Sequence, residues 1–218
     1  MYFKRKIFSM NNKLLIFLLL LIFLILTNCI VVKEKDEIIK KEIEIEYKPS
    51  TKFNIKMSDQ IIRSELGDMV VSVPDGWFFI ETHDRVSSDI FAVVSNPTYT
   101  ISAIFSHIKP ISELAKIVEQ EGTIGLARMI FAKRSTKSSN NIVLVDSYNN
   151  YSVNNHTFTI FNYLKIKDNT LCQTAVFISE IGEFYEFSLA TMNFTNNEML
   201  SRTEFDDIFY SILSTLKY

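Results

Sequence analysis

An uninterrupted apolar run near the start of the 218-residue chain constrains its fold more than any other feature. Residues 14–26 are all Leu, Ile or Phe, and the segment before them carries four basic residues and no acidic one. These 13 apolar residues match the apolar region of a secretory signal peptide and fall short of the about 20 that a membrane-spanning helix needs. The sequence therefore predicts that the rest of the chain is exported.

The run ends in Leu26-Thr27-Asn28-Cys29, which resembles the lipobox of bacterial lipoproteins, although Asn28 stands where that family prefers Gly, Ala or Ser. In that family the signal peptide is cut before the cysteine, which is acylated and becomes the new N-terminus. The resemblance implies a signal peptide over residues 1–28 and a lipid on Cys29. Ile30, in place of Asp, is compatible with sorting to an outer membrane. We expect a protein anchored to the cytoplasmic or outer membrane and facing away from the cytoplasm.

Two other arrangements are compatible with the same segment. Counting from Leu14 through Val32 gives 19 residues, enough for an uncleaved anchor that spans the membrane. The basic residues before it would still place the body outside the cytoplasm. A soluble secreted protein is the third arrangement, and all three export the folded domain.

The charge balance changes when the signal is removed. The full chain has 23 basic and 25 acidic residues, a net charge of −2, and four of the basic residues lie in residues 1–28. The remainder has 19 basic and 25 acidic residues, a net charge of −6. Nucleic acids and anionic lipid head groups both attract basic surfaces. We therefore expect no nucleic-acid partner, and attachment to the membrane through the N-terminus alone.

Residues 29–50 are predicted to be a tether. The stretch 33–48 is mostly charged with mixed sign and has only a thin apolar stripe, and Pro49-Ser50-Thr51 ends the pattern. Such a segment is typical of a solvated spacer, and the alternative is a helix or strand that pairs with a partner. Residues 51–218 are predicted to be the globular domain.

The globular part combines two periodicities. Short apolar runs with turn residues between them predict strands, and spacings of three and four residues predict helices. Runs of strands with few helices indicate an α+β fold, with two main helices on a twisted, mostly antiparallel sheet. The predicted strands cover residues 53–56, 69–73, 77–80, 90–94, 100–105, 142–147, 156–167, 171–180 and 183–192.

Two helices are expected. The first begins near Ser112, a candidate N-cap, and continues to about residue 134 with interruptions at Gly122 and Gly125, before a polar loop over 135–141. The second covers about residues 197–216. Its apolar stripe contains Leu200, Phe205, Ile208, Phe209, Ile212, Leu213 and Leu216.

Two segments resemble the PsbP-like superfamily, which includes bacterial DcrB-like lipoproteins, chloroplast PsbP proteins and the Mog proteins that bind a small GTPase. The first is Val71-Ser-Val-Pro74-Asp-Gly-Trp77, a strand followed by Pro-x-Gly-Trp, and the second is the aromatic hairpin around Gly182 with the closing helix. The resemblance covers residues 65–218. It implies an α/β/α sandwich with a central antiparallel sheet and members that bind other proteins. It carries no shared catalytic set.

The sequence offers few candidate site residues. Glu81, His83 and Asp84 form the best polar cluster, which could bind a cation or be an exposed loop. No His-x-x-x-His spacing is present, so we expect no metal and no cofactor. Cys172 lies in an apolar strand and is interpreted as a core residue.

Aromatic residues supply the other candidates. Trp77 could anchor a partner or fill the core beside the Pro-Gly turn. Tyr148 and Tyr151, with Asn149-Asn150, are predicted to lie in a polar hairpin loop, which could bind a ligand or be a solvated turn.

Two functions remain open from the sequence. The first is a non-catalytic, lipid-anchored module that binds or assembles an unknown envelope protein, because tethering through Cys29 raises its local concentration. The second is an exported enzyme or small-ligand binder with a site near Glu81. A concave pocket with converging polar groups would favour the second function, and a filled core would favour the first.

Overall fold

A computed structural model describes residues 44–46, 55–82, 86–192 and 200–218. The chain divides into two compact units, Met1–Glu42 and Ile43–Tyr218, and every described residue lies in the second. Within the described part, no helix is long and apolar enough to cross a membrane. The apolar run 14–26 and Cys29 lie outside it, so the signal, lipid and anchor remain predictions.

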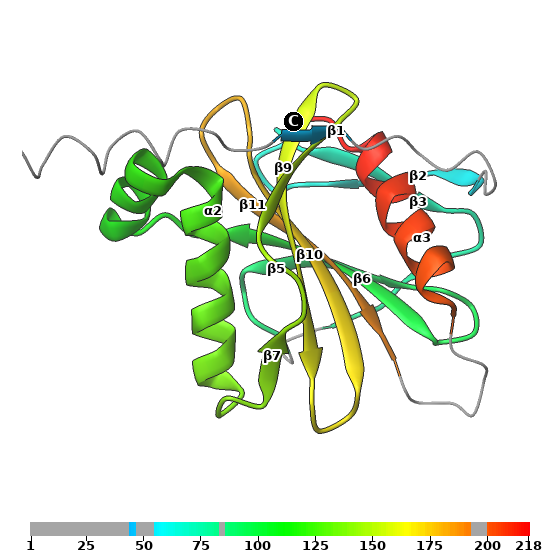
Figure 1. Ribbon diagram of the computed structural model, residues 1–218. Coiled ribbons are helices and arrows are strands. Elements are labelled where there is room, and N and C mark those ends of the chain that lie inside the picture. The colour runs from blue at the N-terminus through cyan, green and yellow to red at the C-terminus, as the bar shows by residue number, and fades with distance from the viewer. Residues whose placement is uncertain (1–43, 47–54, 83–85, 193–199) are drawn as a thin grey trace, which may run out of the picture. The chain divides into compact units, whose positions relative to one another are not determined.

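A nine-stranded sheet forms the centre of the described unit (Figure 1). Its order is β1-β8-β9-β10-β11-β6-β5-β4, and all neighbours are antiparallel except the parallel pair β1–β8. Strands β7 and β8 pair with successive stretches of β9. The strands are β1 (Glu44–Glu46), β4 (Phe78–Phe79), β5 (Ile90–Ser95), β6 (Ile101–Ile108), β7 (Ile142–Leu144), β8 (Asn149–Val153), β9 (His156–Lys165), β10 (Thr170–Ile178) and β11 (Phe184–Thr191).

A different helix packs on each face of the sheet. Helix α2 (Ser112–Lys137) packs on one face, and helix α3 (Arg202–Thr215) packs on the other. Beside α3 lies a two-stranded antiparallel sheet of β2 (Met57–Arg63) and β3 (Val70–Pro74). The result is the predicted α+β fold, with two helices packed on a largely antiparallel sheet.

The sheet separates two cores because successive side chains of a strand point to opposite faces. Phe161, Tyr163 and Val176 pack in the cluster under α2. Phe158 and Phe177 pack in the larger cluster under α3. The central strands therefore contain almost continuous apolar residues, and for this reason they could be predicted from the sequence.

Helix α2 confirms one predicted interruption and corrects its start. Gly122 has φ 63° and ψ −158°, a conformation that kinks the helix and that only glycine adopts easily. Gly125 remains helical. The N-cap is Ile111, which provides no side-chain hydrogen bond, so the predicted capping role of Ser112 is wrong. The helix also continues to Lys137, into the predicted polar loop.

Helix α3 begins with a reciprocal cap. The Ser201 side chain accepts a hydrogen bond from the Glu204 backbone N–H, and the Glu204 carboxylate accepts one from the Ser201 backbone N–H. This capping box satisfies two N–H groups that the first helical turn leaves without partners. The described helix therefore starts at Arg202, later than the predicted start at 197, which lies outside the described residues.

Strand β3 is hydrogen-bonded to the last residue of α3 and to a residue just after it. The backbone N–H of Lys217 donates to the Val70 carbonyl oxygen at 2.9 Å, and the N–H of Val70 donates back to the Lys217 carbonyl at 2.9 Å. The Thr215 hydroxyl accepts from the Ser72 N–H at 3.1 Å. The layer formed by α3 and the β2–β3 sheet is thus held by contacts between segments more than 140 residues apart in the sequence.

Two strands differ from the prediction. Residues 149–153 form strand β8, where the sequence predicted a hairpin loop, and the turn is made by Asn154 and Asn155, with φ of 50° and 67°. The strand that follows β1 is β2, which begins at Met57, whereas the predicted strand 53–56 lies partly outside the described residues. Both strands are rich in polar residues, so their apolar pattern is weak.

Candidate functional site

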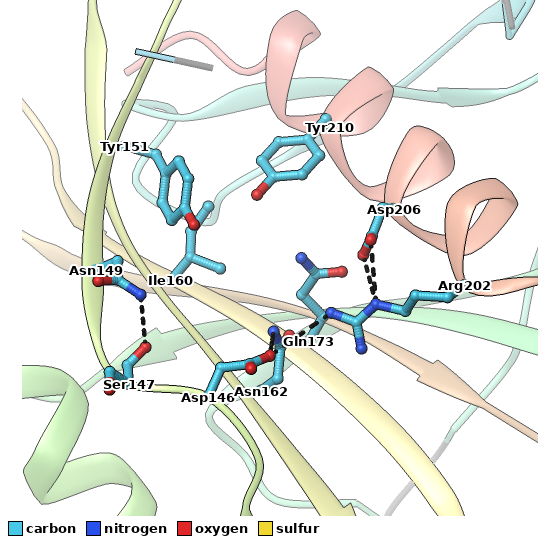
Figure 2. Close-up of a pocket in the computed structure, with 10 residues that line it drawn as sticks. All are labelled: Asp146, Ser147, Asn149, Tyr151, Ile160, Asn162, Gln173, Arg202, Asp206 and Tyr210. Carbon is cyan, nitrogen blue, oxygen red and sulfur yellow. Dashed lines mark hydrogen bonds and ion pairs between the residues drawn. The ribbon is translucent and has the colours of Figure 1, made fainter. Parts of the chain in front are cut away.

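A polar pocket of about 480 Å³ lies between the first turns of α3 and the sheet (Figure 2). One wall comes from β8, β9 and β10, and the other from one side of α3. Asp146 and Ser147, in the segment between β7 and β8, lie at the rim. We call this the α3 pocket.

The sheet wall of the α3 pocket contains two amides. Asn162 on β9 and Gln173 on β10 are direct cross-strand partners, so their side chains lie together on the same face. They are 7% and 2% exposed. In Figure 2 the side chain of Gln173 extends toward the middle of the pocket, between the two tyrosines and Arg202.

The helix wall comes from three residues spaced by four. Arg202, Asp206 and Tyr210 lie on one side of α3, next to the apolar stripe that the helix buries. The Arg202 Nε is 3.1 Å from the Asp206 carboxylate, and its Nη2 is 3.9 Å from Asp146 Oδ2. The guanidinium therefore lies between two carboxylates.

The two amides carry acceptors without partners. Asn162 Nδ2 donates to Asp146 Oδ2 at 2.6 Å, and because a carboxylate only accepts, this contact fixes the amide orientation. Asn162 Oδ1 and Gln173 Oε1 are buried and have no hydrogen-bond partner among the described residues. Leaving a buried acceptor without a partner costs about 1–3 kcal/mol. The lining of the α3 pocket therefore contains two buried acceptors without a partner among the described residues.

The electrostatics of the α3 pocket are nearly balanced. Its charged side chains are Asp146, Arg202 and Asp206, which sum to −1. Burial raises the pKa of the Asp206 carboxyl above its ordinary value, and the Arg202 guanidinium opposes that rise. The pocket offers many acceptors and one strong donor group in a confined space.

The opposite face of the sheet contains a different polar group, which we call the Arg134 cluster: Arg134, Tyr163, Thr174, Glu186 and Ser188. The Arg134 guanidinium pairs with the Glu186 carboxylate, and its Nη1 lies 3.2 Å from Tyr163 Oη and 3.3 Å from Thr174 Oγ1. Ser188 donates to Glu186 at 2.7 Å and lies 2.8 Å from Thr174 Oγ1. Every polar side chain of this cluster has a partner within it.

A second cleft, of about 340 Å³, opens beside the Arg134 cluster. Its lining is mainly apolar and includes Ile104, Ile142 and Cys172. Cys172 is 2% exposed, and burial raises the pKa of its thiol, so it is a core residue as predicted and a poor nucleophile.

The structure separates the residues that the sequence singled out. Cys29, His83 and Asp84 lie outside the described residues. Glu81 is exposed and follows β4, away from the lining of the α3 pocket. Trp77 is 8% exposed and belongs to the core under α3, which agrees with its interpretation as a core residue beside the turn.

The two candidate tyrosines lie on opposite faces of the sheet. Tyr148 packs against Phe161 in the core under α2, with ring centroids 5.4 Å apart. Tyr151 lines the α3 pocket, where its ring lies 6.1 Å from that of Tyr210. Among the candidates that the structure describes, Tyr151 alone lines the pocket.

No metal centre is visible in the part of the chain that the structure describes. No three His, Cys, Asp or Glu side chains gather there in a group that could hold an ion. His107, at the end of β6, is instead engaged by Glu183, with 2.7 Å between Nε2 and Oε2.

Sequence reasoning missed Asn162, Gln173, Arg202 and Asp206. One signal was available, because each amide interrupts an apolar strand: Phe161-Asn162-Tyr163 and Cys172-Gln173-Thr174. A polar side chain in a buried strand needs a partner, which makes it informative. The pairing of the two strands, which brings the amides together, was not visible in the sequence.

Comparison with known proteins identifies the fold. No protein-family model and no curated protein matches the sequence. The structure resembles cyanobacterial PsbP (CyanoP) of Synechocystis sp. PCC 6803, with a TM-score of 0.50 and 14% identity over 79% of this chain and 98% of that one.

Two weaker similarities have TM-scores of 0.49 and 0.37. The first is the Ran-binding protein Mog1p of Saccharomyces cerevisiae, with 10% identity over 74% of this chain and 95% of that one. The second is LpqN of Mycobacterium tuberculosis, which is involved in cell envelope biogenesis, with 13% identity over 74% and 92%. The likeness to CyanoP shows that the chain has the PsbP-like fold implied by its Pro-x-Gly-Trp turn and closing helix.

Proposed function

We propose that the protein is a non-catalytic binding module of the cell envelope, tethered through an acylated Cys29, and that a small polar ligand occupies the α3 pocket. The observation that carries the ligand role is the pair of buried amide oxygens, on Asn162 and Gln173, without partners among the described residues. A ligand with donor groups would satisfy both. The proposed ligand is a small molecule, whereas the sequence predicted a protein partner. The α3 pocket also lies away from the predicted site near Glu81.

The arrangement of charges favours binding over catalysis. A general acid or base must be free to exchange a proton with the substrate. In the α3 pocket both carboxylates contact Arg202, and Asp146 also accepts a hydrogen bond from Asn162. Groups held in this way position a ligand better than they transfer protons.

The lipid anchor is tested by metabolic labelling with a palmitate analogue. The wild-type chain and Cys172→Ser should incorporate label, whereas Cys29→Ala should not, because Cys172 is buried and distant from any lipobox sequence. Label that persists in Cys29→Ala would overturn the anchor and leave the pocket proposal standing.

The ligand role is tested by thermal unfolding of the full chain with the low-molecular-weight fraction of the source envelope. A ligand that binds only the folded state raises the midpoint. The wild type and Asn141→Trp, an exposed substitution outside the pocket, should both show the rise. Asn149→Trp, which places an indole on the pocket wall, should not. An unchanged wild-type midpoint would contradict the ligand role.

A further inference from the structure

We infer that the ligand of the α3 pocket is a neutral, hydroxyl-rich molecule of the sugar class. This inference rests on the proposed function, because it specifies the chemistry of the same pocket. It follows from three properties of the lining: which hydrogen-bonding groups lack partners, how the charges are placed, and where the aromatic rings lie.

The unmet groups define the donors. Asn162 Oδ1 and Gln173 Oε1 belong to side chains at paired positions on adjacent strands, so both side chains lie on the pocket face of the sheet. A molecule with several hydroxyl groups can donate to both oxygens, as the hydroxyls of a sugar ring do.

The charges disfavour both ionic alternatives. An anion would lie against Asp146 and Asp206, and an ammonium group would lie against the guanidinium of Arg202. A hydroxyl group both donates and accepts, so it can donate to the amide oxygens and carboxylates and accept from Arg202. A neutral polyhydroxylated ligand therefore uses every group without placing like charges together.

The aromatic rings supply the remaining wall. Tyr151 on β8 and Tyr210 on α3 have ring centroids 6.1 Å apart and planes at 57° (Figure 2). The face of an aromatic ring is electronegative and apolar, which suits the C–H face of a sugar ring. The volume of about 480 Å³ lies within the range of about 300–1,000 Å³ typical of small-molecule sites.

The test is an NMR titration of the isotope-labelled full chain in a phosphocholine detergent, since detergents with sugar head groups would compete. The probes are glucose, galactose, mannose, N-acetylglucosamine and β-linked disaccharides of these. We expect at least one probe to shift the side-chain amide signals of Asn162 and Gln173. Gln173→Leu should weaken its binding about tenfold, the effect of one lost hydrogen bond. Gln120→Leu, the same change on the exposed side of α2, should leave binding unchanged.

Calcium chloride and putrescine serve as the competing probes. If either shifts the two amide signals and no sugar does, the sugar class is wrong while the ligand role stands. If the envelope fraction raises the unfolding midpoint but no sugar probe binds, the sugar class is again overturned and the ligand role survives. If no probe and no fraction acts on the pocket, both proposals fail together.

Discussion

The two faces of the sheet differ in whether their buried polar side chains have hydrogen-bond partners. Under α2, the Arg134 cluster satisfies its own charges and hydroxyls. Under α3, Asn162 and Gln173 keep acceptors without partners among the described residues. Adjacent residues of β10, Gln173 and Thr174, belong one to each group. A fully satisfied polar network helps to specify a unique core, whereas a buried polar group without a partner is costly.

The largest expected effect on the free energy of unfolding comes from a substitution in the Arg134 cluster. Glu186→Ala leaves the guanidinium of Arg134, which is 27% exposed, without its carboxylate and should lower the free energy of unfolding by about 3–5 kcal/mol. Urea denaturation followed by circular dichroism measures it. Arg128→Ala is the control on the same helix: its ion pair with Glu121 is exposed, so its loss should cost less than about 1 kcal/mol. Equal losses in both variants would contradict a closed network.

A smaller loss is expected from Thr174→Val. The substitution keeps the shape of a fully buried side chain and removes its contacts with Arg134 and Ser188. It should lower the free energy of unfolding by about 1–2 kcal/mol, because Arg134 and Ser188 each lose a hydrogen-bond partner that is itself fully buried. Unchanged stability would show that the cluster reorganises around the gap.

The neighbouring substitution, Gln173→Leu, should have a smaller effect or the opposite sign. It removes an amide whose acceptor has no partner among the described residues, so the free energy of unfolding should change by less than about 1 kcal/mol or increase. Denaturation without ligand, with Gln120→Leu in parallel, measures this difference. A loss above about 2 kcal/mol would mean that Gln173 has an internal role like that of Thr174.

The smallest effect concerns pH. Burial raises the pKa of the Asp206 carboxyl in the folded state above its ordinary value of 3.8, so its ionisation favours the unfolded state. The stability of the wild type relative to Asp206→Asn should therefore fall as pH rises from about 4 through the raised pKa. Unfolding curves of both proteins across this window test the sign. A relative stability that rises with pH would show that Arg202 outweighs burial.

Most of the fold could be predicted from the pattern of apolar residues in the sequence. Strands β5, β6, β9, β10 and β11 and both helices were predicted, because burial on one or two faces leaves continuous or periodic apolar residues. Strand β8 was missed because its sequence, Asn-Asn-Tyr-Ser-Val, has the composition of a turn. It forms because β9 offers it an edge, which is a tertiary cause absent from the local sequence.

The α3 pocket was harder to predict for the same reason. Asn162 and Gln173 are 11 positions apart, and Arg202 follows much later in the chain. Only the antiparallel register of β9 and β10 brings the amides together, and only the packing of α3 places Arg202 against them. Tyr151 was singled out as part of a loop, and it contributes to the pocket from a strand.

The contacts of β3 with the last residue of α3 and with Lys217 set an order of events during synthesis. The hydrogen-bond partner of Ser72 is Thr215, which is synthesised 143 positions later, and that of Val70 is Lys217. At about 5–20 residues per second, this interval lasts about 7–30 s. Until it ends, the apolar side of β3 has no helix to cover it. A nascent chain with this arrangement therefore cannot complete the layer that contains β3 until residues 215–217 have been synthesised.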